Sequence, residues 1–174
     1  MLTEAVRVVA DWLANPVWGV NATLAATPRE ADVPAVPPVA VYDESRDGEV
    51  TRGQIPDDLP ALLVQTTATP LSTVATASRP FPADYSVELG IRYGTATVDT
   101  AAGFNEAALV MRAVHRCLGQ LWVTSAGEAA RVRGQMQLVE LRDTRIEQYQ
   151  ANDDRRIAAA CILTVRMRDL YTNA

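Results

Sequence analysis

A chain of 174 residues, 48% hydrophobic and 21% charged, has the composition of a single globular domain, which excludes disordered and fibrous proteins. Its net charge of −5 disfavours nucleic acid as the main ligand. All 16 basic residues are arginine, and the absence of lysine excludes a Walker-type phosphate loop and Schiff-base chemistry.

The N-terminal residues predict an amphipathic helix. Apolar residues between positions 2 and 13 fall on one side of a helical wheel, and Asn15-Pro16 ends the pattern. Five prolines punctuate residues 16–38, so we expect this segment to be irregular. A short strand is predicted at residues 39–45, followed by a loop or small hairpin built on Asp47-Gly48.

A second predicted strand, residues 60–67, leads into a long segment rich in threonine, serine and alanine. Residues 66–82 show no helical period and carry almost no charge, so we interpret them as an extended arm. Such an arm could pair with the sheet edge of a neighbouring copy, or it could be a disordered loop. The candidate interface residues of the arm are Thr69, Leu71, Thr73, Val74, Thr76 and Arg79.

Two periodic segments follow the arm. Apolar and polar residues alternate between positions 84 and 93, which predicts a strand with one buried face. From position 100 to 122 the period changes to that of a helix with a broad apolar face. Glu106 and Arg112 fall on its polar side. The apolar face is broad enough to pack on a sheet and also to contact the N-terminal helix.

The last part of the chain predicts two long strands after a connection. Residues 125–134 are interpreted as the connection, and residues 135–149 as a strand whose phase slips around Asp143, as a bulge would cause. Residues 157–170 form the closing strand. The element order predicts a single α+β domain over residues 1–174, with a mainly antiparallel sheet and both helices on one face.

No catalytic constellation is visible. His115, the only histidine, lies at the edge of the apolar face of its helix, and Cys117 and Cys161 lie on apolar faces. We therefore expect all three to be structural, with the cysteines as buried thiols. Ser125 lacks the frame of a nucleophile elbow. We expect no enzyme activity, no cofactor and no catalytic residue.

The nearest approach to a metal motif is the segment from Asp43 to Gln54. Asp43, Ser45 and Asp47 occupy the first, third and fifth positions of a calcium-binding loop, and Gly48 occupies the sixth. The twelfth position holds Gln54, where calcium binding needs a bidentate glutamate. We interpret the segment as an acidic surface turn and expect no metal site.

Four arginines mark a second candidate interface on the polar face of the two closing strands. They are Arg142, Arg145, Arg166 and Arg168. Cross-strand ion pairs or contacts with another subunit explain these residues, because the stacking aromatics of a nucleic-acid surface are not interleaved with them.

The element order resembles that of the bacteriophage tail terminator (tail completion) family. The resemblance rests on "PALLVQTTATP…DYSVELGIRYGTA", on the helix "AAGFNEAALVMRAVHRCLGQL" and on the closing "RRIAAACILTVRMRDL". It implies a structural virion protein, made in the host cytoplasm, that forms a homohexameric ring in the neck. The ring would cap the tail tube, contact the head–tail connector and let duplex DNA pass through its lumen without specific binding.

Two alternatives stay open: another head–tail neck or connector protein, or a small ligand-binding or enzymatic α+β domain. Charge favours assembly, since residues 1–60 carry −6 and residues 131–174 carry +2, so that identical copies can meet head to tail. No run approaches the ~18 apolar residues that a membrane span needs, so we expect no membrane partner.

Overall fold

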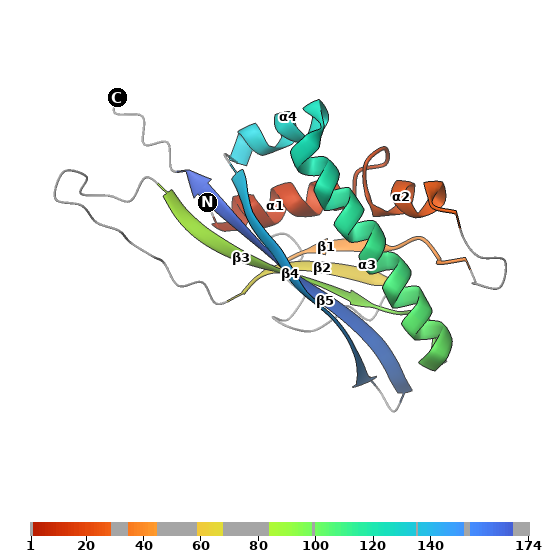
Figure 1. Cartoon of the computed structure of the whole chain (residues 1–174). Coiled ribbons are helices and arrows are strands. Elements are labelled where there is room, and N and C mark those ends of the chain that lie inside the picture. The colour runs from red at the N-terminus through yellow and green to blue at the C-terminus, as the bar shows by residue number, and fades with distance from the viewer. Residues whose placement is uncertain are drawn as a thin grey trace, which may run out of the picture.

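The computed structural model describes residues 2–28, 35–44, 59–67, 84–98, 100–134, 136–151 and 154–168 (Figure 1). Within these ranges lie four helices and five strands. In chain order they are α1 (Leu2–Leu13), α2 (Val20–Ala26), β1 (Ala40–Asp43), β2 (Ala61–Thr66), β3 (Asp84–Gly94), α3 (Thr100–Val123), α4 (Ser125–Gly134), β4 (Met136–Ala151) and β5 (Asp154–Arg168).

The strands form one sheet in the order β1-β2-β3-β5-β4. Every neighbouring pair is antiparallel except β1 and β2, which run parallel from Ala40 opposite Ala61 to Asp43 opposite Val64. The predicted α+β class with a mainly antiparallel sheet is therefore confirmed. The parallel pair was not predicted, because an isolated four-residue strand carries no signal for its direction.

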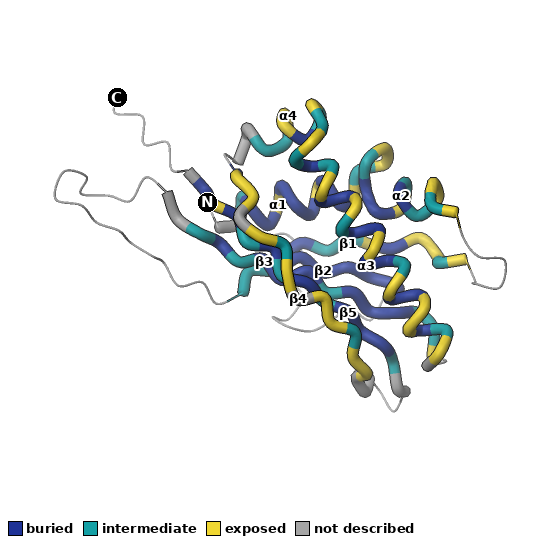
Figure 2. Tube along the Cα trace, in the orientation of Figure 1, coloured by how far each residue is buried: buried dark blue, intermediate teal, exposed yellow. Residues whose placement is uncertain are grey.

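One core lies between the sheet and its helices. Alternate residues of β3, from Val87 to Tyr93, are fully buried and share this core with alternate residues of β5, as the sequence pattern predicts. The buried faces of α1 and α3 belong to the same core, so both helices lie on one side of the sheet (Figures 1 and 2). The other face of β3, β5 and β4 carries the polar side chains.

Two tryptophans join α1 to α3. Trp12 and Trp18 stack with ring centroids 6.4 Å apart, and the Trp12 indole N–H donates to the Cys117 carbonyl at 2.8 Å. The Cys117 thiol donates to the Trp18 carbonyl at 3.0 Å. A large aromatic pair thereby closes one end of the core, with the buried indole N–H of Trp12 satisfied.

The prediction that residues 16–38 are irregular is wrong for α2. Asn15 stabilises the turn between α1 and α2, because its side-chain oxygen accepts the amide hydrogens of Val17 and Trp18. Asn21 of α2 then exchanges two hydrogen bonds with the main chain of Val39, at 2.8 and 3.0 Å. This helix is only seven residues long, so tertiary contacts and not a repeating pattern stabilise it.

The prediction that residues 125–134 are a connection is also wrong, because they form α4. Thr124 caps the helix, since its hydroxyl oxygen accepts the Gly127 amide hydrogen at 3.0 Å. Arg131 anchors it by donating from Nε to the Leu121 carbonyl at 2.8 Å, with its guanidinium over the Trp122 ring. The helix lacks a clear apolar face in sequence, so periodicity alone missed it.

The two glycines around this helix junction provide a matched test. A Cβ at Gly127 would overlap the Leu121 carbonyl, whereas a Cβ at Gly119 in α3 would meet no atom within 4 Å. We expect Gly127→Ala to lower the free energy of unfolding by about 1–3 kcal/mol. Gly119→Ala should raise it by about 0.5–1 kcal/mol, because alanine favours a helix. Urea denaturation measures both, and equal effects of the two substitutions would contradict the described packing.

The predicted slip in the long strand is confirmed. The register between β4 and β5 shifts twice. The first shift lies between Leu138 and Glu140, and the second lies between Arg142 and Arg145, the interval that contains Asp143. Because each bulge inserts an extra residue, the side chains that follow return to the faces that the alternation requires. None of the described helices is long and apolar enough to cross a membrane.

Candidate functional site

The two strands that flank the predicted arm end at different positions along the strand direction of the sheet. The arm residues Thr69 to Arg79 lie outside the described ranges, but the strands before and after the arm, β2 and β3, are described. The last pair between β2 and β3 joins Thr66 to Leu89, whereas β3 begins at Asp84. Five residues of β3 therefore project about 16 Å beyond the end of β2.

This projecting end of β3 has one paired edge, and one edge along which no other strand of the described residues pairs; we call the second the open edge. On one side it stays bonded to β5, down to Asp84 opposite Arg168. On the other side the last bond runs from the Thr67 amide hydrogen to the Glu88 carbonyl at 3.0 Å. Main-chain groups alternate in direction along a strand, so the N–H and C=O of Ser86 point to the same side as those of Glu88. No described strand pairs with Ser86 there.

The sheet register places three of the four predicted arginines, Arg142, Arg145 and Arg166, on the face of the sheet opposite the helices. Arg166 lies between Ser86 and Gln137, while Arg142 and Arg145 lie opposite Ile162 and Ala160. Arg142, Arg145 and Arg166 are exposed, and Arg168 pairs with Asp84 through its main chain. Exposed residues run along β4 in Figure 2.

One of these arginines is already engaged within the chain. Arg142 reaches across β5 to Glu88 of β3, with Nη2 and Oε1 2.8 Å apart, and its Nε lies 3.8 Å from Oε2 of Glu140. Such exposed pairs contribute about 0–1 kcal/mol each. The expectation of cross-strand ion pairs is therefore confirmed for Arg142, which links the edge strand β4 to the central strand β3 across β5.

The histidine and the cysteines are packed groups. His115 lies 2.9 Å from the Thr144 hydroxyl, joining α3 to the bulge of β4, and burial lowers the pKa of its imidazole. Burial raises the pKa of the Cys117 and Cys161 thiols to about 12. Both thiols are therefore protonated at neutral pH and lack the thiolate that nucleophilic chemistry needs.

A buried carboxylate was missed by the sequence pattern, which placed Glu106 on the polar side of its helix. Glu106 is only 7% exposed, and its Oε1 accepts the Tyr93 hydroxyl at 2.5 Å and the Ala96 amide hydrogen at 3.1 Å. The Thr97 hydroxyl donates to Oε2. Burial and the neighbouring carboxylate raise the pKa of Tyr93. The only signal in the sequence was the presence of hydrogen-bond donors, such as the Thr97 hydroxyl, shortly before the helix. That these donors share Glu106 as acceptor is decided by the folded structure.

The acidic segment after β1 and an apolar cavity are the two other candidate sites. Asp43 is buried in β1, and the calcium-like segment that follows lies outside the described ranges after Glu44. No three His, Cys, Asp or Glu side chains among the described residues are grouped to hold a metal ion. A cavity of about 370 Å³ lies between α2, residues 35–38 and α3, with apolar walls that include Leu24, Val36 and Leu109.

Comparison with known proteins adds no relative: no family model and no curated protein matches the sequence.

Proposed function

We propose that the chain is a structural protein of a bacteriophage tail, a terminator that forms a homohexameric ring on the end of the tail tube. The open edge of β3 at Ser86 carries the proposal. None of the described residues pairs along it, and such an edge is a template for a strand of another chain at the place where the arm meets the sheet. In the ring, the arm of one copy contacts the sheet of the next.

Two further features support this assembly. The acidic first third and the basic last third of the sequence favour a head-to-tail contact between identical copies. A heterologous contact closes into a ring when the rotation between subunits divides the circle. The proposed partners are the tail tube protein below, the head–tail connector above and duplex DNA in the lumen. With a net charge of −5 per subunit, a polar or acidic lumen would let DNA slide.

The assembly itself is the first test. We expect the purified protein at micromolar concentration to have about six times the 18.8 kDa subunit mass by size-exclusion chromatography with light scattering, and to show rings by negative-stain electron microscopy. A lumen lined by Arg166 and Arg168 would contradict the proposal, because those residues should make subunit or neck contacts. A monomer or a twofold dimer would also overturn the terminator assignment.

A matched pair of substitutions tests the open edge. Ser86→Pro removes an N–H that faces the open side, and proline is tolerated at such an edge position. Ser86→Ala keeps that N–H. We expect the proline variant to assemble at least about tenfold more weakly than the alanine variant, since it loses a main-chain hydrogen bond and blocks strand approach. Equal assembly of two folded variants would mean that this edge is not an interface.

A further inference from the structure

The surface around α2 carries no charge. Residues 12–28, which include α2, and residues 35–42, which lead into β1, contain no Asp, Glu, Lys, Arg or His, although 21% of the whole chain is charged. We call the exposed residues of these two ranges the α2 surface; residues 29–34 between them lie outside the described part of the chain. Val17 on this surface is 67% exposed. Charged residues are depleted at the centres of protein interfaces, so the α2 surface has the composition of an interface.

The apolar cavity of about 370 Å³ lies within the α2 surface, between α2, residues 35–38 and α3. The polar side chains in its wall already have partners. The Asn21 amide exchanges two hydrogen bonds with the main chain of Val39, and the Thr27 hydroxyl donates to the Thr23 carbonyl at 2.7 Å. A polar guest would leave its own groups unpaired there, so the cavity suits an apolar side chain.

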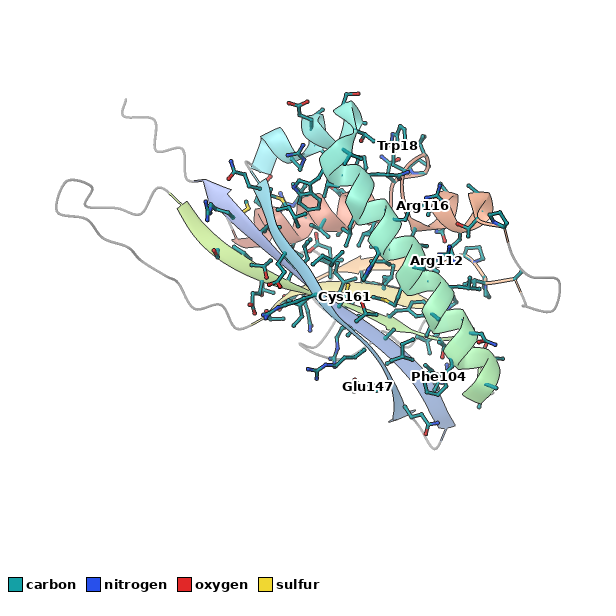
Figure 3. All side chains as sticks on the ribbon, viewed as in Figure 1. Trp18, Phe104, Arg112, Arg116, Glu147 and Cys161 are labelled. Carbon is teal, nitrogen blue, oxygen red and sulfur yellow. The ribbon has the colours of Figure 1, made fainter. Side chains whose placement is uncertain are left out.

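A candidate apolar side chain lies on the opposite edge of the sheet. The exposed large apolar residues of the described ranges are Val17, Val98, Phe104, Val123 and Leu138. Val17 belongs to the α2 surface itself. Val98 precedes α3, and Phe104 and Val123 lie on α3, the helix that forms one wall of the cavity (Figure 3). Leu138 is 45% exposed and lies on β4, away from the cavity.

The sheet places Leu138 and the cavity so that one copy can contact the next. β4 and β1 are its two edge strands, four strand spacings or about 19 Å apart, so Leu138 does not reach the cavity of its own subunit (Figure 1). Leu138 pairs with the core residue Val165, and Val20 of α2 belongs to the same core, so both surfaces lie on the helix side of the sheet. The open edge of β3 faces the side of β2 and β1 as well.

We propose that the α2 surface receives the β4 edge of a neighbouring copy, with Leu138 of that copy in the cavity between α2 and α3. The two surfaces lie at opposite edges of one subunit, so the contact is heterologous and copies follow one another head to tail. A copy seated there also approaches the open edge of β3. This inference rests on the proposed ring and names its contact from described residues alone.

Cross-linking between two variants tests the contact directly. Chains with Leu138→Cys and chains with Ala25→Cys, a residue of the cavity wall, are assembled in equal amounts and treated with a short bismaleimide. Each chain carries one of the two positions, so a link from 138 to 25 joins two subunits. The native Cys117 and Cys161 are buried and should stay unmodified. We expect this link by mass spectrometry, and its absence when Val123→Cys replaces Leu138→Cys as the matched control.

A charge at the same position gives the second measurement. Leu138→Asp should weaken assembly at least about tenfold in light scattering over a dilution series, because a carboxylate in the apolar cavity loses its hydration. Val123→Asp changes another exposed aliphatic residue and should leave assembly unchanged. Circular dichroism should show both variants folded. If Leu138→Asp does not fold, Leu138→Ala replaces it, with a smaller weakening expected.

The outcomes separate this contact from the ring. A hexamer without links from position 138 to position 25, or one unaffected by the substitutions at Leu138, retains the ring and overturns the contact. Links between two copies of position 138 would indicate a twofold pairing of β4 edges and would also overturn it. A filament, or a ring of another size, that carries the expected link retains the contact and overturns the terminator ring. A monomer overturns both.

Discussion

The free energy of unfolding should fall steeply between about pH 9 and pH 12. Burial raises the pKa of Cys117 and Cys161 from 9.0 to about 12, so above pH 9 the folded chain holds protons that the unfolded chain releases. The free energy of unfolding then falls as pH rises, by about 1.4 kcal/mol per pH unit for each thiol. Below pH 9 both states are protonated and this dependence vanishes. By pH 12 the two thiols together lower the free energy of unfolding by about 8 kcal/mol, which is comparable to the roughly 5–15 kcal/mol that stabilises a whole domain.

The slope of stability against pH is the decisive measurement. Urea denaturation under reducing conditions, followed by tryptophan fluorescence, gives the free energy of unfolding at intervals from pH 8 to pH 10. In that window Tyr93 still contributes little, because its raised pKa matters only above its ordinary value of 10.0. The control Cys117→Ala with Cys161→Ala should lower stability at neutral pH but largely remove the slope. A control as steep as the native protein would contradict the assigned cause.

Glu106→Ala should be the most destabilising substitution of a polar residue, lowering the free energy of unfolding by about 3–5 kcal/mol. The change leaves the Tyr93 hydroxyl and the Ala96 amide hydrogen, both bonded to Oε1 in the native chain, without their acceptor. Unpaired buried donors retain the full cost of leaving water. Because Glu106 fixes the connection from β3 to α3, the loss should extend to the packing of that helix.

Two variants serve as controls for this substitution. Glu128→Ala removes an exposed acid from α4 and should change stability by less than about 0.5 kcal/mol. Glu106→Gln keeps the shape and one acceptor oxygen but turns an amide toward a donor, so its loss should lie between the other two. Urea denaturation at pH 7 ranks the three proteins. A Glu106→Ala protein within about 1 kcal/mol of the native chain would show that the network does not contribute as described.

Periodic segments were predictable from the sequence. The alternation in β3 and β5 requires one apolar face, and the structure buries those residues. The broad apolar arc of α3 and the phase slip near Asp143 were equally readable, because each follows from the fixed geometry of a helix or a strand. The surroundings of the predicted arginine interface were predictable only in part. Alternation predicts the face on which Arg142 lies, but it does not predict that Glu88 of β3 is its partner across the sheet.

The sequence by itself determined the class of fold, because hydrophobic periodicity acts within each element. Tertiary structure alone decided the rest. Short α2 and α4 form because Asn21 meets Val39 and Arg131 meets Leu121, partners that are distant or unmarked in sequence. Likewise, Glu106 is buried because three donors converge on it only after β3 and α3 dock. Long-range contacts decide whether these short helices form and whether Glu106 is buried. The periodicity of a sequence does not tell which distant residues come into contact.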